Sequence, residues 1–204
     1  MKELFKTNWD AADIILVPIC VIIDYLGKLL AYSISIPWWF DSVGTIIASS
    51  LGGPVIGMIT GIMHNCTYGL STGIVSSMMY SLTSMGIALV VGTMVRKGYT
   101  ESYLKLMLII LNTIIVSVLI SSSINIILFN GAVGNVWGDG FIKAAIESGL
   151  DYRIASVLGE LLIDVPDKLL CMLLAYVIMI ILPSRARLLY NFERIKIKKN
   201  IDKL

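Results

Sequence analysis

The sequence is poor in the residue types on which soluble enzymes and metalloproteins depend. Only 15% of its 204 residues are charged, and it contains a single histidine, His64. Its three cysteines, Cys20, Cys66 and Cys171, are scattered without CxxC spacing, so neither a disulfide framework nor a metal site is expected. Walker A, HExxH and GxSxG motifs are also absent. We therefore expect no enzymatic activity, no metal, no cofactor and no nucleic-acid partner.

Apolar residues dominate what remains. They make up 57% of the chain, and the mean hydropathy is +0.85. A soluble domain is closer to half apolar and a quarter charged, so the composition indicates an integral membrane protein in contact with a lipid bilayer. The first apolar run follows a charged start and has no small-residue cleavage site after it, so we interpret it as a retained span.

The apolar runs predict an all-α fold with six transmembrane helices in one membrane domain, residues 1–183. The second and third are too short to cross a core of about 30 Å, and we expect either a re-entrant hairpin or two short helices buried by longer neighbours. The segment FIKAAIESGL predicts a further short interfacial helix. The predicted spans are residues 11–30, 41–51, 54–66, 74–95, 106–129 and 154–182.

A basic tail, residues 184–204, follows the last span. Together with Pro183 this segment holds seven Lys or Arg and two acidic residues. The positive-inside rule places it in the cytoplasm, and six spans then place the N-terminus there too. The turn at 52–54 and Arg96-Lys97 fall on the same side. The external face receives the connectors 31–40, 67–73 and 130–153.

Three glycines, Gly53, Gly57 and Gly61, recur every four residues in the third span. This spacing places them on one helix face, where another helix backbone can approach closely. We expect ordinary helix packing or the docking of a partner protein.

Several ionisable residues lie inside apolar runs, where burying a charge is costly. Asp24 and Lys28 are four residues apart and are predicted to pair on one helix face. Asp167 and Lys168 are predicted to form a structural ion pair with neighbouring helices, with Asp24 or Lys28 as possible partners. Glu160 and Asp164 share one face near the outer end of the sixth span, where they are candidates for ligand contact.

Tryptophans lie on two of the outer connectors. Trp38 and Trp39 are either membrane-belt residues or ligand contacts. Trp39 and Trp137 are also candidates to sandwich a flat heterocycle. The fifth span carries a serine and asparagine stripe, which is more typical of helix–helix hydrogen bonding than of a ligand surface. A pocket of this kind favours a flat, polar, cationic or neutral ligand over a large anion.

The stretch DSVGTIIASSLGGPVIGMITGIMHN, residues 41–65, resembles the second and third helices of substrate-binding S components of energy-coupling factor (ECF) vitamin transporters. The shared pattern is an acidic residue, Gly-Thr, a Gly-Pro turn, small-residue spacing and a terminal Asn. PDKLL, residues 166–170, is similar to the Asp-Lys motif in the last helix of one branch of that group. The resemblance covers residues 11–183.

This resemblance implies a six-helix subunit of a bacterial plasma membrane that captures a vitamin-like micronutrient from outside. It implies docking onto a transmembrane T component with two ATPase subunits, although the first span offers only Ala11 and Ala12 as small docking residues. The ligand-binding residues it implies are Trp38, Trp39, Asp41, Asn65, Tyr80, Ser84, Trp137, Glu160 and Asp164.

Two other functions remain open from the sequence. One is a membrane sensor or assembly protein that uses the same small-residue bundle without transport. The other is a standalone secondary transporter with Asp164 or Asp24 as proton carrier, although such proteins usually show two related halves with matched broken helices.

Overall fold

The computed structural model describes residue 5 and residues 11–183, and every regular element in those residues is helical. This confirms the predicted all-α class; the basic tail, 184–204, lies outside the described residues. A 3-10 helix, η2 (Val75–Tyr80), leads directly into α4, and a second, η3 (Tyr99–Glu101), precedes α5. The α-helices are α1 (Ala11–Ser33), α2 (Val43–Gly52), α3 (Pro54–Thr72), α4 (Ser81–Arg96), α5 (Tyr103–Leu128), α6 (Val136–Glu147) and α7 (Tyr152–Ile181).

Three helical segments of the described chain are long and apolar enough to cross a membrane: α1, η2 joined to α4, and α5. These helices are consistent with the predicted membrane protein, whereas the count of six spans stays a prediction. At about 1.5 Å per residue, the ten residues of α2 reach only about 15 Å. Helix α7 has 30 residues, but its apolar run is interrupted by Glu160, Asp164, Asp167 and Lys168.

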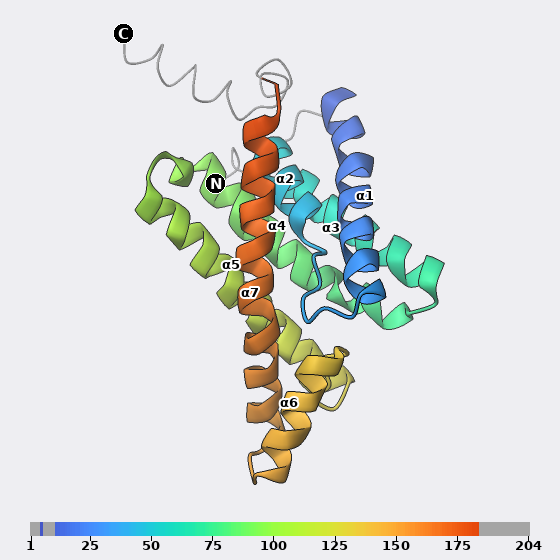
Figure 1. The fold of residues 1–204 in the computed structure, drawn as a ribbon. Coiled ribbons are helices and arrows are strands. Elements are labelled where there is room, and N and C mark those ends of the chain that lie inside the picture. The colour runs from blue at the N-terminus through green and yellow to red at the C-terminus, as the bar shows by residue number, and fades with distance from the viewer. Residues whose placement is uncertain (1–4, 6–10, 184–204) are drawn as a thin grey trace.

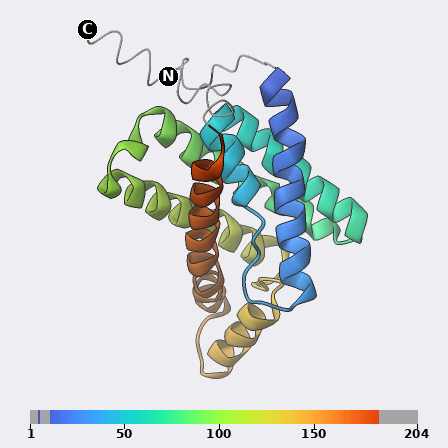
Figure 2. The ribbon, with the colours of Figure 1, turned by 45° about the horizontal axis from the view of Figure 1, so that its top comes forward.

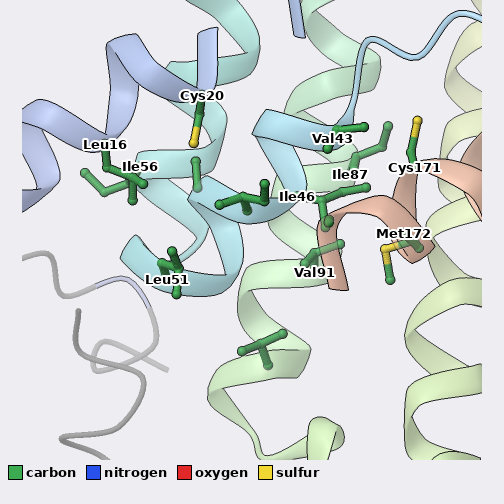
Figure 3. Close-up of a cluster of buried hydrophobic side chains, with 14 of the residues drawn as sticks. Leu16, Cys20, Val43, Ile46, Leu51, Ile56, Ile87, Val91, Cys171 and Met172 are labelled. Carbon is green, nitrogen blue, oxygen red and sulfur yellow. The ribbon is translucent and has the colours of Figure 1, made fainter. Parts of the chain in front are cut away.

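The short helix α2 lies at the centre of the bundle, and every one of its residues is buried. Helices α1, α3, α4 and α7 surround it (Figure 1, Figure 2). Figure 3 shows their apolar side chains pointing toward one another around α2, including Leu16 of α1, Ile56 of α3, Ile87 of α4 and Met172 of α7. Because α2 is covered by its neighbours, it does not need to span the membrane, and this favours the second of the two predicted arrangements.

The start of α2 is capped by a carboxylate from another helix. Asp24 of α1 accepts hydrogen bonds from the backbone N–H groups of Gly44 (2.6 Å) and Thr45 (2.9 Å) and from the Thr45 hydroxyl (2.7 Å). A helix N-terminus has unpaired N–H groups and a positive dipole end, which a carboxylate satisfies. The predicted pairing of Asp24 with Lys28 is therefore wrong. The Asp24 carboxylate binds the start of α2, and the Lys28 ammonium binds Asp41.

The turn between α2 and α3 lies at residues 52–54, where the Gly-Gly-Pro sequence predicted it. Gly53 has φ +92°, a conformation that side chains disfavour, and Pro54 occupies the first turn of α3, where its missing N–H costs nothing. The guanidinium of Arg96, at the end of α4, donates to the Gly52 carbonyl oxygen at 3.0 Å. The 52–54 turn and the end of α4 therefore lie at the same end of the bundle, as predicted.

The glycine series packs inside the chain. A Cβ at Gly57 would collide with the Ser49 hydroxyl of α2, and one at Gly61 would lie 2.5 Å from the Ser84 Cβ of α4. Of the two possibilities left open, helix packing thus accounts for these glycines. At the start of α1, Ala11 is exposed and Ala12 is half-buried.

Helix α3 is longer than predicted. Residues 67–72, expected as a connector, continue the helix to Thr72, and Gly73 ends it in the left-handed conformation with φ +76°. The polar composition of this segment suggested a loop, but Tyr68 is only 2% exposed and packs edge-on against Tyr25 of α1. Packing of the Tyr68 ring against α1 favours continuation of α3 through this segment.

Candidate functional site

A cavity of about 240 Å³ lies in the half of the bundle away from the 52–54 turn. Its wall combines the end of α1, the end of α3, η2, the start of α4, the end of α5 and the middle of α7. The connectors 34–42 and 129–135, which lead into α2 and α6, also contribute (Figure 1). Segments distant in the sequence thus converge on one cavity, which is how small-molecule sites are typically built.

Aromatic rings form part of this wall. Trp39, Tyr68, Tyr80 and Phe129 all line the cavity. Tyr80 and Phe129 stack on each other, with centroids 6.1 Å apart and an interplanar angle of 17°. Rings held in place by such neighbours offer a flat ligand preformed apolar contact.

Lys28 reaches the cavity from α1. Its ammonium donates to the Asp41 carboxylate at 2.9 Å and to the Ser77 hydroxyl at 3.2 Å. It also lies 4.9 Å from the ring centroid of Tyr68 and 5.6 Å from that of Trp39, within cation–π range. Lys28 therefore ties α1 to the start of α2, to the end of α3 and to η2.

Lys168 of α7 forms the second basic centre. Its ammonium lies 2.7 Å from Asp167, 3.3 Å from Asp164 and 4.0 Å from Asp41. The other oxygen of Asp167 accepts from the backbone N–H groups of Trp39 (3.0 Å) and Phe40 (2.9 Å). The predicted Asp167–Lys168 pair is thus present, but it holds the 34–42 connector on α7 and does not reach Asp24 or Lys28.

The remaining two carboxylates on α7 are tied to α5. Asp164 accepts from the Ser117 hydroxyl at 2.5 Å, and Glu160 accepts from the Asn125 amide at 2.7 Å. The Tyr80 hydroxyl donates to the Asn125 oxygen at 2.6 Å. Ser117 and Asn125 of the serine and asparagine stripe therefore serve helix–helix hydrogen bonding, as the sequence favoured, whereas Asn112 and Ser123 bond to carbonyls of α5 itself.

The structure gathers six of the nine predicted ligand-binding residues around this cavity. They are Trp39, Asp41, Tyr80, Ser84, Glu160 and Asp164. Asn65 lies behind the wall, where its amide donates to the Ser84 hydroxyl (2.9 Å) and its oxygen accepts from Ser77 (3.3 Å). Asn65 thus orients two lining hydroxyls.

The other two predicted residues, Trp38 and Trp137, do not line the cavity. Trp38 packs edge-on against Phe40, with centroids 6.1 Å apart. Trp137 is 60% exposed, and its indole N–H donates to the Ser35 carbonyl oxygen at 3.1 Å. The structure does not form the proposed sandwich of Trp39 and Trp137, because Gly138, the next residue of α6, is the one that packs inward against Ile163.

The two connectors that lead into α2 and α6 meet beside the cavity. The Asn135 amide caps α6 through its oxygen and donates from its nitrogen to the Pro37 carbonyl at 3.0 Å. The Asp139 carboxylate accepts from the backbone N–H of Val133, a lining residue, at 2.7 Å. The Asn135 bond to Pro37 and the Trp137 bond to Ser35 join residues 35–37 to the 130–139 segment, and we call the joined segments the connector cover.

Several lining residues escaped the sequence analysis as ligand contacts. Lys28 and Lys168 were predicted only to form ion pairs, while Tyr68 and Phe129 carried no signal of their own. Tyr68 lies one helical turn after His64, so extending the third helix would have placed it on the buried face. Phe129 ends α5 and depends on tertiary placement alone.

The arrangement is suited to binding. Its polar groups are carboxylates, ammonium groups and hydroxyls held in mutual hydrogen bonds, and its rings supply flat contact. Within residues 11–183, no cluster of three or more His, Cys, Asp or Glu is arranged to hold a metal ion. No family model, curated protein or solved structure matches the chain.

Proposed function

We propose that the chain is the membrane-embedded substrate-binding S component of an ECF-type importer, capturing a vitamin or related micronutrient from outside the cell. The observation that carries the proposal is the cavity lined by Lys28, Asp41, Glu160 and aromatic rings inside an apolar helical protein. Burying so many polar groups in a membrane protein is costly, and such residues typically mark a substrate site.

The predicted topology supports the same function. Six spans place the connectors 31–40 and 130–153 outside, and these contribute the connector cover. The 52–54 turn and Arg96 then face the cytoplasm, at the opposite end from the cavity. A ligand would enter from the outside and be held beneath the cover.

Energy for uptake would come from partners. The chain has no nucleotide-binding motif, so a T component and two ATPase subunits would supply the driving force. The exposed face of α1, with Ile15, Ile19 and Ile22 beside Ala11 and Ala12, is apolar and available for contact with lipid or with a T component.

Reconstitution tests this function. We expect the full-length chain to co-purify with a T component and two ATPases from the same genome when all four are co-expressed. Proteoliposomes of that complex should accumulate the substrate only with ATP. Failure to form the complex with any such module, or uptake by the chain alone, would contradict the proposal.

A standalone secondary transporter is the second candidate, because Glu160 and Asp164 are buried carboxylates of the kind that carry protons. Proteoliposomes that contain the chain alone separate the two. Uptake driven by a proton gradient, lost in Asp164→Asn, would favour this candidate over the S component.

A further inference from the structure

The cavity has more acidic than basic groups. The ammonium groups of Lys28 and Lys168 face the lining carboxylates of Asp41, Asp164 and Glu160, and Asp167 lies directly behind them. Lys28 pairs with Asp41, and Lys168 makes its shortest contact with Asp167. Two carboxylates, those of Asp164 and Glu160, therefore exceed the available basic groups.

Glu160 is the carboxylate with the least compensation. It is only 3% exposed, and no Lys or Arg nitrogen of the described residues lies within ion-pair distance of it. Its hydrogen-bond donor is the neutral amide of Asn125. An ionised carboxylate buried in this way is strongly destabilised unless a positive group comes near it.

Asp164 adds to this field, one helical turn further along the same face of α7. It shares the Lys168 ammonium with Asp167 and Asp41, so one positive charge serves three carboxylates. The two residues thus present a negative wall to the cavity, in which Asp164 has only the shared Lys168 ammonium and Glu160 has no basic partner.

The neighbouring rings suit a cation as well. Tyr80 lines the cavity beside Glu160 and is joined to it through Asn125, and its ring stacks on Phe129. The negative face of an aromatic ring attracts a cation, and both rings offer flat contact. Lys28 already occupies the corresponding position over Tyr68 and Trp39, which shows that this cavity accommodates an ammonium against ring faces.

We propose that the cavity selects a small organic cation, a protonated amine or amidine on a flat ring, and places its N–H groups against Glu160 and Asp164. This inference rests on the proposed binding function and specifies its substrate class. The cavity of about 240 Å³ is below the roughly 300–1,000 Å³ typical of drug-sized ligands, so the ligand is small. Lys28 and Lys168 are already neutralised by Asp41 and Asp167, which disfavours an anion.

Three ring compounds of nearly equal shape test the charge preference: benzamidine (cation), benzamide (neutral) and benzoate (anion). Their dissociation constants for the purified full-length chain are measured from ligand-dependent thermal unfolding in detergent. We expect benzamidine to bind at least about tenfold more tightly than benzamide, and benzoate to bind most weakly.

Substitution of Glu160 tests whether its carboxylate causes the preference for a cationic ligand. Glu160→Gln keeps the shape of the side chain and removes its charge, and we expect it to weaken benzamidine binding at least about tenfold while benzamide binding changes by less than about twofold. Because no ion pair is lost, its unliganded melting temperature should be unchanged or higher. Glu147→Gln, at the exposed end of α6, is the matched control and should keep the wild-type preference.

The inference is overturned if benzamide or benzoate binds as tightly as benzamidine, if benzamidine does not bind, or if Glu160→Gln binds it as tightly as wild type. The last result would mean that Glu160 is held protonated and neutral. None of these results prevents the complex with the T component and ATPases from forming, so failure of this inference is distinguishable from failure of the proposed function.

Discussion

The two halves of the bundle differ in how they treat a buried carboxylate. In the half packed around α2, Asp24 accepts three hydrogen bonds and is completely enclosed. In the hollow half, Glu160 is almost as buried but faces a cavity without an ion-pair partner. A buried carboxylate therefore stabilises the fold in the packed half, whereas in the hollow half it remains available to bind a ligand.

The apolar side chains follow the same division. The packed half contains the cluster in Figure 3, drawn from the start of α1, all of α2 and the far ends of α4 and α7. In the hollow half, hydroxyls, carboxylates and rings join aliphatic residues such as Ile87 in the wall of the open space. We expect substitutions in the packed half to change stability, and those in the hollow half to change ligand affinity.

The largest expected effect is on stability, from Asp24→Ala. The substitution leaves two helix N–H groups and the Thr45 hydroxyl buried without an acceptor, and each unsatisfied donor costs about 1–3 kcal/mol. We expect a loss of at least about 3 kcal/mol, measured as a lower thermal or denaturant midpoint in detergent.

Asp151→Ala is the matched control for that substitution, since Asp151 also caps a helix N-terminus, that of α7, but is exposed. Its cost should be about 1 kcal/mol. Equal losses of stability in the two variants would show that the buried cap of α2 stabilises the protein no more than an exposed cap does.

Next in size is Gly57→Ala in the packed half. The added Cβ collides with the Ser49 hydroxyl, and overpacking of this kind costs about 1–3 kcal/mol. The melting temperature should fall, while the benzamidine affinity of the folded fraction stays the same.

Gly140→Ala is its control, because Gly140 of α6 has open space around its Cα. Alanine is the better helix former, so this variant should be as stable as wild type or more stable. A Gly57→Ala protein with wild-type stability would contradict the close approach of α2 and α3.

In the hollow half, Trp39→Ala should weaken benzamidine binding by about 1–3 kcal/mol, since the indole lines the cavity. Asp167 is bound by the backbone N–H of Trp39, so the substitution retains that hydrogen bond and leaves the connector in place. Titration of the thermal midpoint with benzamidine measures the change.

The smallest effect is expected from Trp137→Ala. Its side chain lies outside the cavity and contributes one exposed hydrogen bond to Ser35, so affinity should fall by less than about 1 kcal/mol. A loss as large as that of Trp39→Ala would indicate that Trp137 moves onto the ligand when it binds.

Sequence reasoning was strongest where local pattern determines structure. The apolar runs predicted the helices, and Gly52-Gly53-Pro54 predicted the turn between the second and third, because glycine and proline restrict the backbone directly. It singled out Glu160 and Asp164 because acidic groups inside apolar runs are conspicuous, whereas Tyr80 and Ser84 were predicted from the family resemblance alone. The prediction of one outward-facing pocket also drew on the family resemblance.

It was weaker where partners are distant in the chain. Asp24 and Lys28 are four residues apart, which suggested a local pair, but each is bound by a residue of the segment that follows α1. Phe129 joins the cavity wall through tertiary packing that no local pattern reveals, and Tyr68 was missed because the third helix was predicted to end before it. Trp137 resembled a ligand contact in the sequence, yet the direction in which it points depends on how α6 packs on α7.

Native mass spectrometry of the detergent-purified full-length chain tests the central claim, that the hollow half holds a small molecule. We predict an adduct of a few hundred daltons on the wild-type protein and on Glu147→Gln, and its loss from a correctly folded Glu160→Gln. A folded wild-type protein that stays empty after exposure to the growth medium, or an adduct that Glu160→Gln retains in full, would contradict the account.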